Sequence, residues 1–221
     1  MKTIGILSAS FAALGLSACV SLLPEGGDLS PRLTLDAGAP RPAASDMLPV
    51  TLAVADPRSE AIFNTSNVAV LTSPLQYEYL AEAEWTDRAP LLLGRFLERR
   101  FENTGLFGGV GDRVAIPVSD YTLQTDIRAL NLDRTGGQRR AVVAYGARLL
   151  DRRGNTLGSR VFQAEQPVDG AGNAAAVLAL NTAAQRAADE TIAWSEPLVR
   201  QDLRNREANP RSRGRADSLS D

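Results

Sequence analysis

Residues 119–133 read SDYTLQTDIRALNLD, and they decide the fold because apolar and polar side chains alternate along them. One face of the stretch carries Tyr121, Leu123, Thr125, Ile127 and Ala129, and the other carries Thr122, Gln124, Asp126 and Arg128. A period of two residues is typical of a strand that buries one face. The stretch therefore predicts a β-strand at the edge of a hydrophobic core.

Two tight turns connect this strand to the two segments that follow. The turn TGG (135–137) leads into RRAVVAYGARLLD (139–151). The turn DRRGN (151–155), in which Gly154 suits a positive φ, leads into LGSRVFQAEQPV (157–168). Short turns between neighbouring strand-like segments predict an antiparallel meander of three strands.

Upstream segments add further strands. RLTLDAG (32–38) could form a first strand, and LPVTLAVADP (48–57) has the apolar, β-branched composition of a buried strand. Residues 68–85 favour two strands around Ser73-Pro74. Residues 58–67 fit either a short helical turn or an edge segment, and GGVGD (108–112) predicts a turn.

Two segments change to the helical period. Residues 87–105 place Leu92, Leu93, Phe96, Leu97, Arg100 and Phe101 at spacings of three and four, with Asp87 as the expected N-cap and Gly105 as the stop. Residues 171–198 predict an alanine-rich second helix, capped by Asn173 and ended by Pro197. The expected fold class is α+β: a single domain over 32–198, with a mainly antiparallel (mixed) sheet packed against two amphipathic helices.

The composition excludes several kinds of site. Cys19 is the only cysteine among 221 residues and there is no histidine, so an internal disulfide, a zinc site and the Ser-His and Cys-His nucleophile pairs are excluded. The net charge of −2 gives no field that favours nucleic acid. We expect a protein that is not an enzyme, with no metal, no cofactor and no nucleic-acid partner.

The first nineteen residues predict a secretory signal followed by lipid attachment. Lys2 precedes a run of about 14 apolar residues, too short to span a bilayer, which needs roughly 20. Residues 16–19, Leu-Ser-Ala-Cys, resemble a bacterial lipobox, whose pattern implies cleavage between Ala18 and Cys19 and acylation of the Cys19 thiol. The alternative is an ordinary signal peptide with an incidental cysteine. We expect a signal peptide over 1–18 and a lipidated tether over 19–31.

Val20, where an Asp would resemble an inner-membrane retention signal, implies the outer membrane and a periplasmic orientation.

Residues 199–221 predict a disordered, Arg-rich tail, because no apolar periodicity is evident there. The tail is either simply solvated or in contact with anionic lipid, peptidoglycan or a partner.

Two groups of side chains are weaker site candidates. Trp85 is either a core or hinge aromatic or, with Tyr77 and Tyr79, an anchor for a partner subunit. The acids Glu78, Glu82, Glu84 and Asp87 are more easily read as solvated charges than as an acid–base pair.

The middle of the chain resembles the ABC-type transport auxiliary lipoproteins. The resemblance rests on YEYLAEAEW (77–85), PLLLGRFLERRFENTGLFGGV (90–110), SDYTLQTDIRALNLD (119–133) and the strands and Ala-rich helix that follow, over about residues 32–196. It implies a non-enzymatic lipoprotein that works with an MCE-domain protein and an ABC permease and ATPase to move phospholipid or other hydrophobic molecules between the two membranes. It also implies possible self-association. The alternative is an outer-membrane lipoprotein that assists envelope assembly or a cell-wall synthase.

Overall fold

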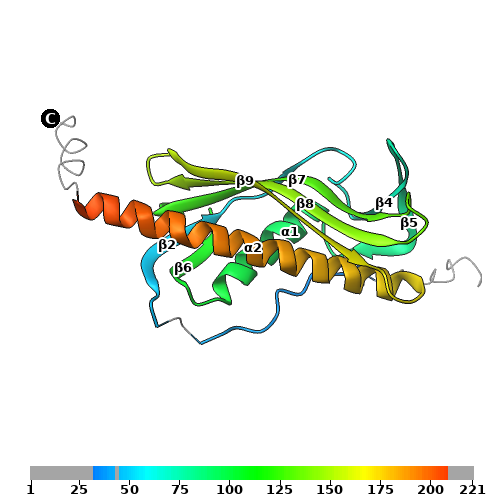
Figure 1. Cartoon of the computed structure of the whole chain (residues 1–221), viewed down its shortest axis with the longest axis horizontal. Coiled ribbons are helices and arrows are strands. Elements are labelled where there is room, and N and C mark those ends of the chain that lie inside the picture. The colour runs from blue at the N-terminus through cyan, green and yellow to red at the C-terminus, as the bar shows by residue number, and fades with distance from the viewer. Residues whose placement is uncertain (1–31, 43–44, 209–221) are drawn as a thin grey trace, which may run out of the picture. The chain divides into compact units, whose positions relative to one another are not determined.

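The computed structural model describes residues 32–42 and 45–208, and within them the expected α+β class is confirmed: one mixed sheet of nine strands and two helices (Figure 1). The first strands are β1 (Arg32–Leu33), β2 (Leu48–Val54), β3 (Arg58–Ser59), β4 (Asn67–Ser73) and β5 (Gln76–Trp85). Helix α1 (Ala89–Glu102) follows, and then come β6 (Phe107–Asp112), β7 (Tyr121–Asp133), β8 (Arg140–Asp151), β9 (Thr156–Pro167) and the long helix α2 (Gly172–Ala208).

Strand β7 organises the sheet. Along one edge it pairs with β8 over its whole length, and β8 pairs with β9, so the predicted antiparallel meander is confirmed. Along its other edge β7 receives three parallel partners in turn: β2 at residues 121–123, β3 at 126–127 and β4 at 131–133. The sheet therefore forks, with β6 outside β2 and with β5 and then β1 outside β4.

A bulge at Arg128 changes which side chains of β7 face the core. Ile127 pairs with Tyr145 and Ala129 with Ala144, so one extra residue lies in β7 between these pairs. Before the bulge the odd-numbered residues Tyr121 to Ile127 are buried as predicted, but beyond it Leu130 and Leu132 face the core. The prediction that Ala129 shares the face of Ile127 is wrong, because a bulge shifts the alternation by one residue.

Both helices cover the same face of the sheet. Leu52 of β2, beneath α1, lies beside Tyr121 of β7, and the Tyr145 hydroxyl of β8 lies 2.9 Å from Thr191 Oγ1 of α2 on that same face. Helix α2 approaches β9 closely because Gly158 lacks a side chain: a Cβ there would lie 2.8 Å from Leu198 Cδ1. Small residues along α2 allow this close packing, and Ala183, Ala184 and Ala187 are fully buried.

Three upstream details differ from the sequence prediction. The first strand is limited to Arg32–Leu33, because the chain then leaves β5 to bind the helices. Residues 107–112 form an edge strand parallel to β2 rather than a turn, so tertiary pairing overrides their glycine content. The N-cap of α1 is Arg88, whose backbone N–H is bonded by the Asp87 carboxylate, and not Asp87 itself.

The largest correction concerns the end of α2. The helix continues through Pro197 to Ala208, so residues 199–208 belong to the domain and not to a disordered tail that begins at 199. Pro197 occupies the exposed side of the helix, while Val199 is fully buried beyond it. Asn173 does not cap the helix either, since its amide donates across to the Ala81 carbonyl at 3.0 Å. Residues 209–221 lie outside the described residues.

Candidate functional site

The segment that follows β1, residues 34–42, is called the strap here because it runs between the two helices. On the side of α2, the Asp36 backbone N–H donates to Asn181 Oδ1 at 2.7 Å, and Gln185 Nε2 donates to the Asp36 carbonyl at 2.8 Å. The strap therefore replaces strand pairing with bonds to helical side chains, which satisfies its backbone polar groups.

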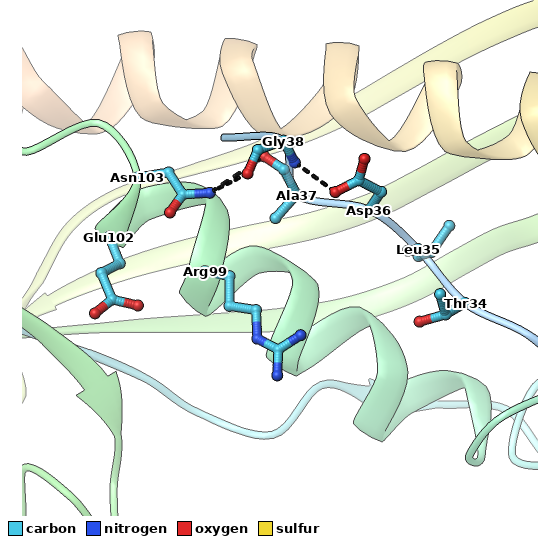
Figure 2. Close-up of a pocket in the computed structure, with 8 residues that line it drawn as sticks. All are labelled: Thr34, Leu35, Asp36, Ala37, Gly38, Arg99, Glu102 and Asn103. Atoms are coloured by element: carbon cyan, nitrogen blue, oxygen red, sulfur yellow. Dashed lines mark hydrogen bonds between the residues drawn. The ribbon is translucent and has the colours of Figure 1, made fainter. Parts of the chain in front are cut away.

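On the side of α1, one arginine and one asparagine hold the strap. Arg100 Nη1 donates to the Ala37 carbonyl at 2.9 Å. Asn103 Nδ2 donates to the Gly38 carbonyl at 2.6 Å (Figure 2). The same guanidinium binds the Asp189 carboxylate of α2 in a bidentate fashion, with both distances at 2.8 Å. Because the Arg100 side chain is only 15% exposed, this charge-assisted contact joins α1, α2 and the strap at one point.

A shallow cavity of about 510 Å³ lies beside this junction. Its lining consists of Thr34, Leu35, Asp36, Ala37, Gly38, Arg99, Glu102 and Asn103. Figure 2 shows the side chains of Arg99 and Glu102 diverging from α1, while the Asp36 carboxylate accepts the Gly38 backbone N–H at 2.9 Å. The cavity thus offers separate polar groups rather than a paired acid and base.

The three aromatic candidates of β5 occupy different environments. Trp85 is fully buried, so the core alternative is the one that the structure supports, and the side chain offers no surface to a partner. The Tyr77 ring packs edge-on against Phe63 with centroids 5.7 Å apart. Only Tyr79, 45% exposed, presents substantial surface. Strict alternation would place Trp85 on the same face as Tyr77 and Tyr79. The strand bulges between Tyr79 and Glu84, where Glu82 adopts φ +57°, so the alternation does not hold as far as Trp85.

The acidic candidates near β5 take separate roles. Asp87 pairs with Arg95 of α1 at 3.1 Å, and Glu84 pairs with Arg32 of β1 at 3.5 Å. Glu78 and Glu82 are exposed. Among the residues that the structure describes, no group of three or more acidic or cysteine side chains could hold a metal ion.

Two buried tyrosines have strongly perturbed pKa values. Burial raises the pKa of Tyr145, although its hydrogen bond to Thr191 acts in the opposite direction. Burial also raises the pKa of Tyr121, and its hydrogen bond to the Asp202 carboxylate adds to the effect. Both hydroxyls therefore stay protonated at neutral pH and act as structural hydrogen-bonding groups.

The cluster around Tyr121 was not predicted from the sequence. The Tyr121 hydroxyl donates to Asp202 Oδ2 at 2.8 Å, and Arg206 Nη2 lies 2.7 Å from the same carboxylate. The Arg206 guanidinium also lies 5.2 Å from the centre of the Tyr121 ring. The spacing of Asp202 and Arg206 by four residues was the available helical signal. Arg100 and Asp189 carried no such signal, because they are distant in sequence.

Cys19 and Ala18, the predicted lipidation and cleavage positions, lie outside the described residues. No helix among residues 32–42 and 45–208 is long and apolar enough to cross a membrane.

Together these features define a class of protein: an α+β domain whose mixed sheet is covered on one face by two helices, with a strap after the first strand that is bound by both helices. A solved structure of a Xanthomonas campestris protein shares this fold, with a TM-score of 0.66 and 24% identity over 78% of this chain and 95% of that one. A second solved structure, of an uncharacterized protein, has a TM-score of 0.57 and 18% identity over 66% and 92% of the two chains.

The chain belongs to the family of ABC-type transport auxiliary lipoprotein components, whose family model matches residues 33–193. An uncharacterized protein of Bradyrhizobium diazoefficiens is 29% identical over 185 residues, which is 82% of this chain. This chain spans about half of that relative, 49% of its length.

Proposed function

We propose that the protein is a non-enzymatic component of an ABC transport system that moves phospholipid or another hydrophobic molecule between the inner and outer membranes. The observation that carries the proposal is the family match over residues 33–193, which covers nearly the whole described domain. In this proposal the system includes an MCE-domain protein, a permease and an ATPase, and this chain supplies a docking domain rather than a catalytic one.

The anchor in this proposal is Cys19, acylated after cleavage behind Ala18. Two or three acyl chains hold a protein stably on a bilayer, whereas one chain does so only marginally. Val20 supports the outer membrane as the destination, with the domain in the periplasm.

The strap gives this anchor a firm attachment to the domain. Every residue between Cys19 and the strap lies upstream of the hydrogen bonds at Asp36, Ala37 and Gly38. A load applied through the N-terminal chain reaches β5 first, through its pairing with β1, and then both helices through Arg100 and its partner Asp189. A docking subunit that is held at the membrane needs such a connection to keep its orientation.

Burial reduces the set of aromatic side chains that could contact a partner. Tyr79 remains a candidate contact, and the packing of Tyr77 against Phe63 holds the neighbouring part of the strand in place. Trp85 supports the same strand from within the core.

The experiment has two parts. Membrane fractionation of Cys19→Ala tests the anchor, with Ser21→Ala as a control that keeps the cysteine: the first variant should leave the outer-membrane fraction and the second should remain. Detergent copurification of the wild-type chain, with mass spectrometry of proteins and lipids, tests the partners. Recovery of an MCE-domain protein and an ABC permease is the expected result. Recovery of a cell-wall synthase without them would instead support the envelope-assembly alternative.

A further inference from the structure

The turn between β4 and β5 combines two unfavourable features in one residue, Leu75. Leu75 is fully solvent-exposed, at 102% of its reference area, and its backbone adopts φ +73°. With Pro74 before it, this is the pattern of a type II turn, whose third position normally holds glycine or asparagine. A left-handed backbone disfavours an ordinary L-residue by roughly tenfold in population.

Neither feature contributes to packing within the described domain. The hairpin is held instead by neighbours of Leu75: the Ser73 hydroxyl lies 3.2 Å from Gln76 Oε1, and Tyr77 packs against Phe63. A strained and exposed apolar residue that the fold does not need suggests a role in contact with something else.

The direction in which the chain enters β1 indicates what Leu75 contacts. β1 runs parallel to β5, with Arg32 beside Glu84 and Leu33 beside Trp85. The N-terminal end of β1 is therefore oriented toward the end of the sheet at which β5 begins, and that end carries Leu75. Figure 1 shows the β4–β5 hairpin at the end of the sheet opposite the C-terminal end of α2.

The length of the N-terminal chain fits this direction. Along β5, the distance from Gln76 to Glu84 is at most about 27 Å. The thirteen residue steps from Cys19 to Arg32 can span up to about 45 Å when extended. A lipid group on Cys19 can therefore lie level with the hairpin tip or beyond it.

The charges near the tip are compatible with a phospholipid surface. Arg134 is exposed, and its backbone N–H bonds to the Leu71 carbonyl of β4 at 2.9 Å. The neighbouring acid, Asp133, is occupied by Thr135 and Arg140. Glu78 of β5 is exposed, so the contact depends on the apolar side chain and not on net positive charge.

We propose that Leu75, at the tip of the β4–β5 hairpin, inserts into the lipid bilayer that carries the Cys19 anchor. The proposal rests on the lipid attachment of the proposed function. A bilayer fits a single convex leucine because hydrocarbon adapts to any shape, whereas a protein partner would need a matching pocket. Burial of one leucine in an apolar phase favours the bound orientation by about tenfold to a hundredfold.

Fluorescence quenching tests the insertion directly. The full, lipidated chain carrying L75W is placed in phosphatidylethanolamine and phosphatidylglycerol vesicles whose acyl chains are brominated. The extra emission of L75W relative to wild type should be lost in these vesicles and retained in unbrominated ones. The matched control is V118W: Val118 is also exposed, at 68%, but lies just before β7, while the hairpin tip lies beyond the last residue of that strand. Its emission should be unaffected.

Further measurements separate the possible failures. Protein that does not float with vesicles overturns the lipid anchor and this inference with it. If the protein floats but the L75W emission is not quenched by brominated lipid, the insertion alone is overturned. The same holds if the L75W side chain is shielded from aqueous iodide but is not quenched by bromine, because that result would indicate contact with a protein. If L75W does not fold, Q76W tests the same tip at a position with φ outside the left-handed region. L75N should keep or raise the melting temperature, since asparagine suits the turn; a drop would assign Leu75 a structural role.

Discussion

The contact between Tyr121 and Asp202 allows a quantitative test of whether the last ten residues of α2 belong to the folded domain. Tyr121 is fully buried at the start of β7, and its hydroxyl donates to Asp202 Oδ2 at 2.8 Å. Asp202→Ala removes the acceptor and leaves this hydroxyl without its partner, which costs about 1–3 kcal/mol. Loss of the helical ion pair with Arg206 adds about 0.3–0.5 kcal/mol.

We therefore expect Asp202→Ala to lower the free energy of unfolding by about 2 kcal/mol. For a domain of this size that corresponds to a fall of about 4–8 °C in melting temperature. Tyr121→Phe should cost less, about 0.5–1.5 kcal/mol, because Asp202 keeps Arg206 and no buried donor is left unpaired. Once the hydroxyl is gone, Asp202→Ala should add little, so the two effects should fall short of additivity by about 1 kcal/mol.

Urea denaturation of the two single variants and the double variant measures this coupling. Glu207→Ala is the matched control, since it removes an exposed acid from the same end of the helix. The reasoning is refuted if Asp202→Ala changes stability by less than about 0.5 kcal/mol, the range of ordinary surface substitutions. It is also refuted if the two variants are fully additive.

Three further predictions concern the same domain. A chain ending after Leu198 should melt at a lower temperature than one ending after Ala208, because only the shorter chain loses the buried Val199; equal melting temperatures would contradict the packed helix. Arg100→Ala should lower stability by about 2 kcal/mol and speed proteolysis in the strap, with Arg100→Lys recovering only part because it lacks the bidentate fork; unchanged cleavage would contradict the role of Arg100. The backbone N–H and hydroxyl of Thr135 hold the pKa of Asp133 below its ordinary value, so its stabilising effect is complete at neutral pH and is lost as pH falls from about 4 through the lower folded pKa. Asp133→Asn should therefore reduce the urea midpoint at pH 7 more than at pH 3, and an equal reduction at both would contradict the shift.

The strand pairings that were predicted correctly are the local ones, although the long-range strands β2 and β4 were also expected as strands. β7, β8 and β9 are connected by short turns, and Gly154 adopts the positive φ (+84°) that its turn was expected to need. The pairing of β2, β3 and β4 with one edge of β7 is parallel and long-range. No turn signal marks such pairing, so no local pattern indicated that residues 107–112 would become a strand.

The error at the end of α2 has a different cause. Proline usually ends a helix because it lacks a backbone N–H and its ring crowds the preceding turn. Here Pro197 lies on the exposed side, and the losses are offset by Val199 in the core and by Asp202 on Tyr121. A local rule failed because tertiary contacts beyond the proline outweigh it.

For the candidate site, the lipobox could be recognised since it is a contiguous motif, whereas Arg100 and Asp189 are 89 positions apart and meet only in the fold.

Helix α2 connects the parts of the molecule on which the proposals depend. Near its start Asn173 binds the bulge of β5, in its middle Asp189 binds Arg100, and near its end Asp202 binds Tyr121. A helix of 37 residues extends about 55 Å, so these three contacts fix β5, the strap and β7 to one stiff element. The hairpin that carries Leu75 is therefore held in a fixed orientation relative to β1, where the N-terminal chain enters. Weakening the Arg100–Asp189 contact should consequently reduce the quenching of L75W by brominated lipid without removing the protein from the vesicles, since the anchor would persist while the orientation is lost.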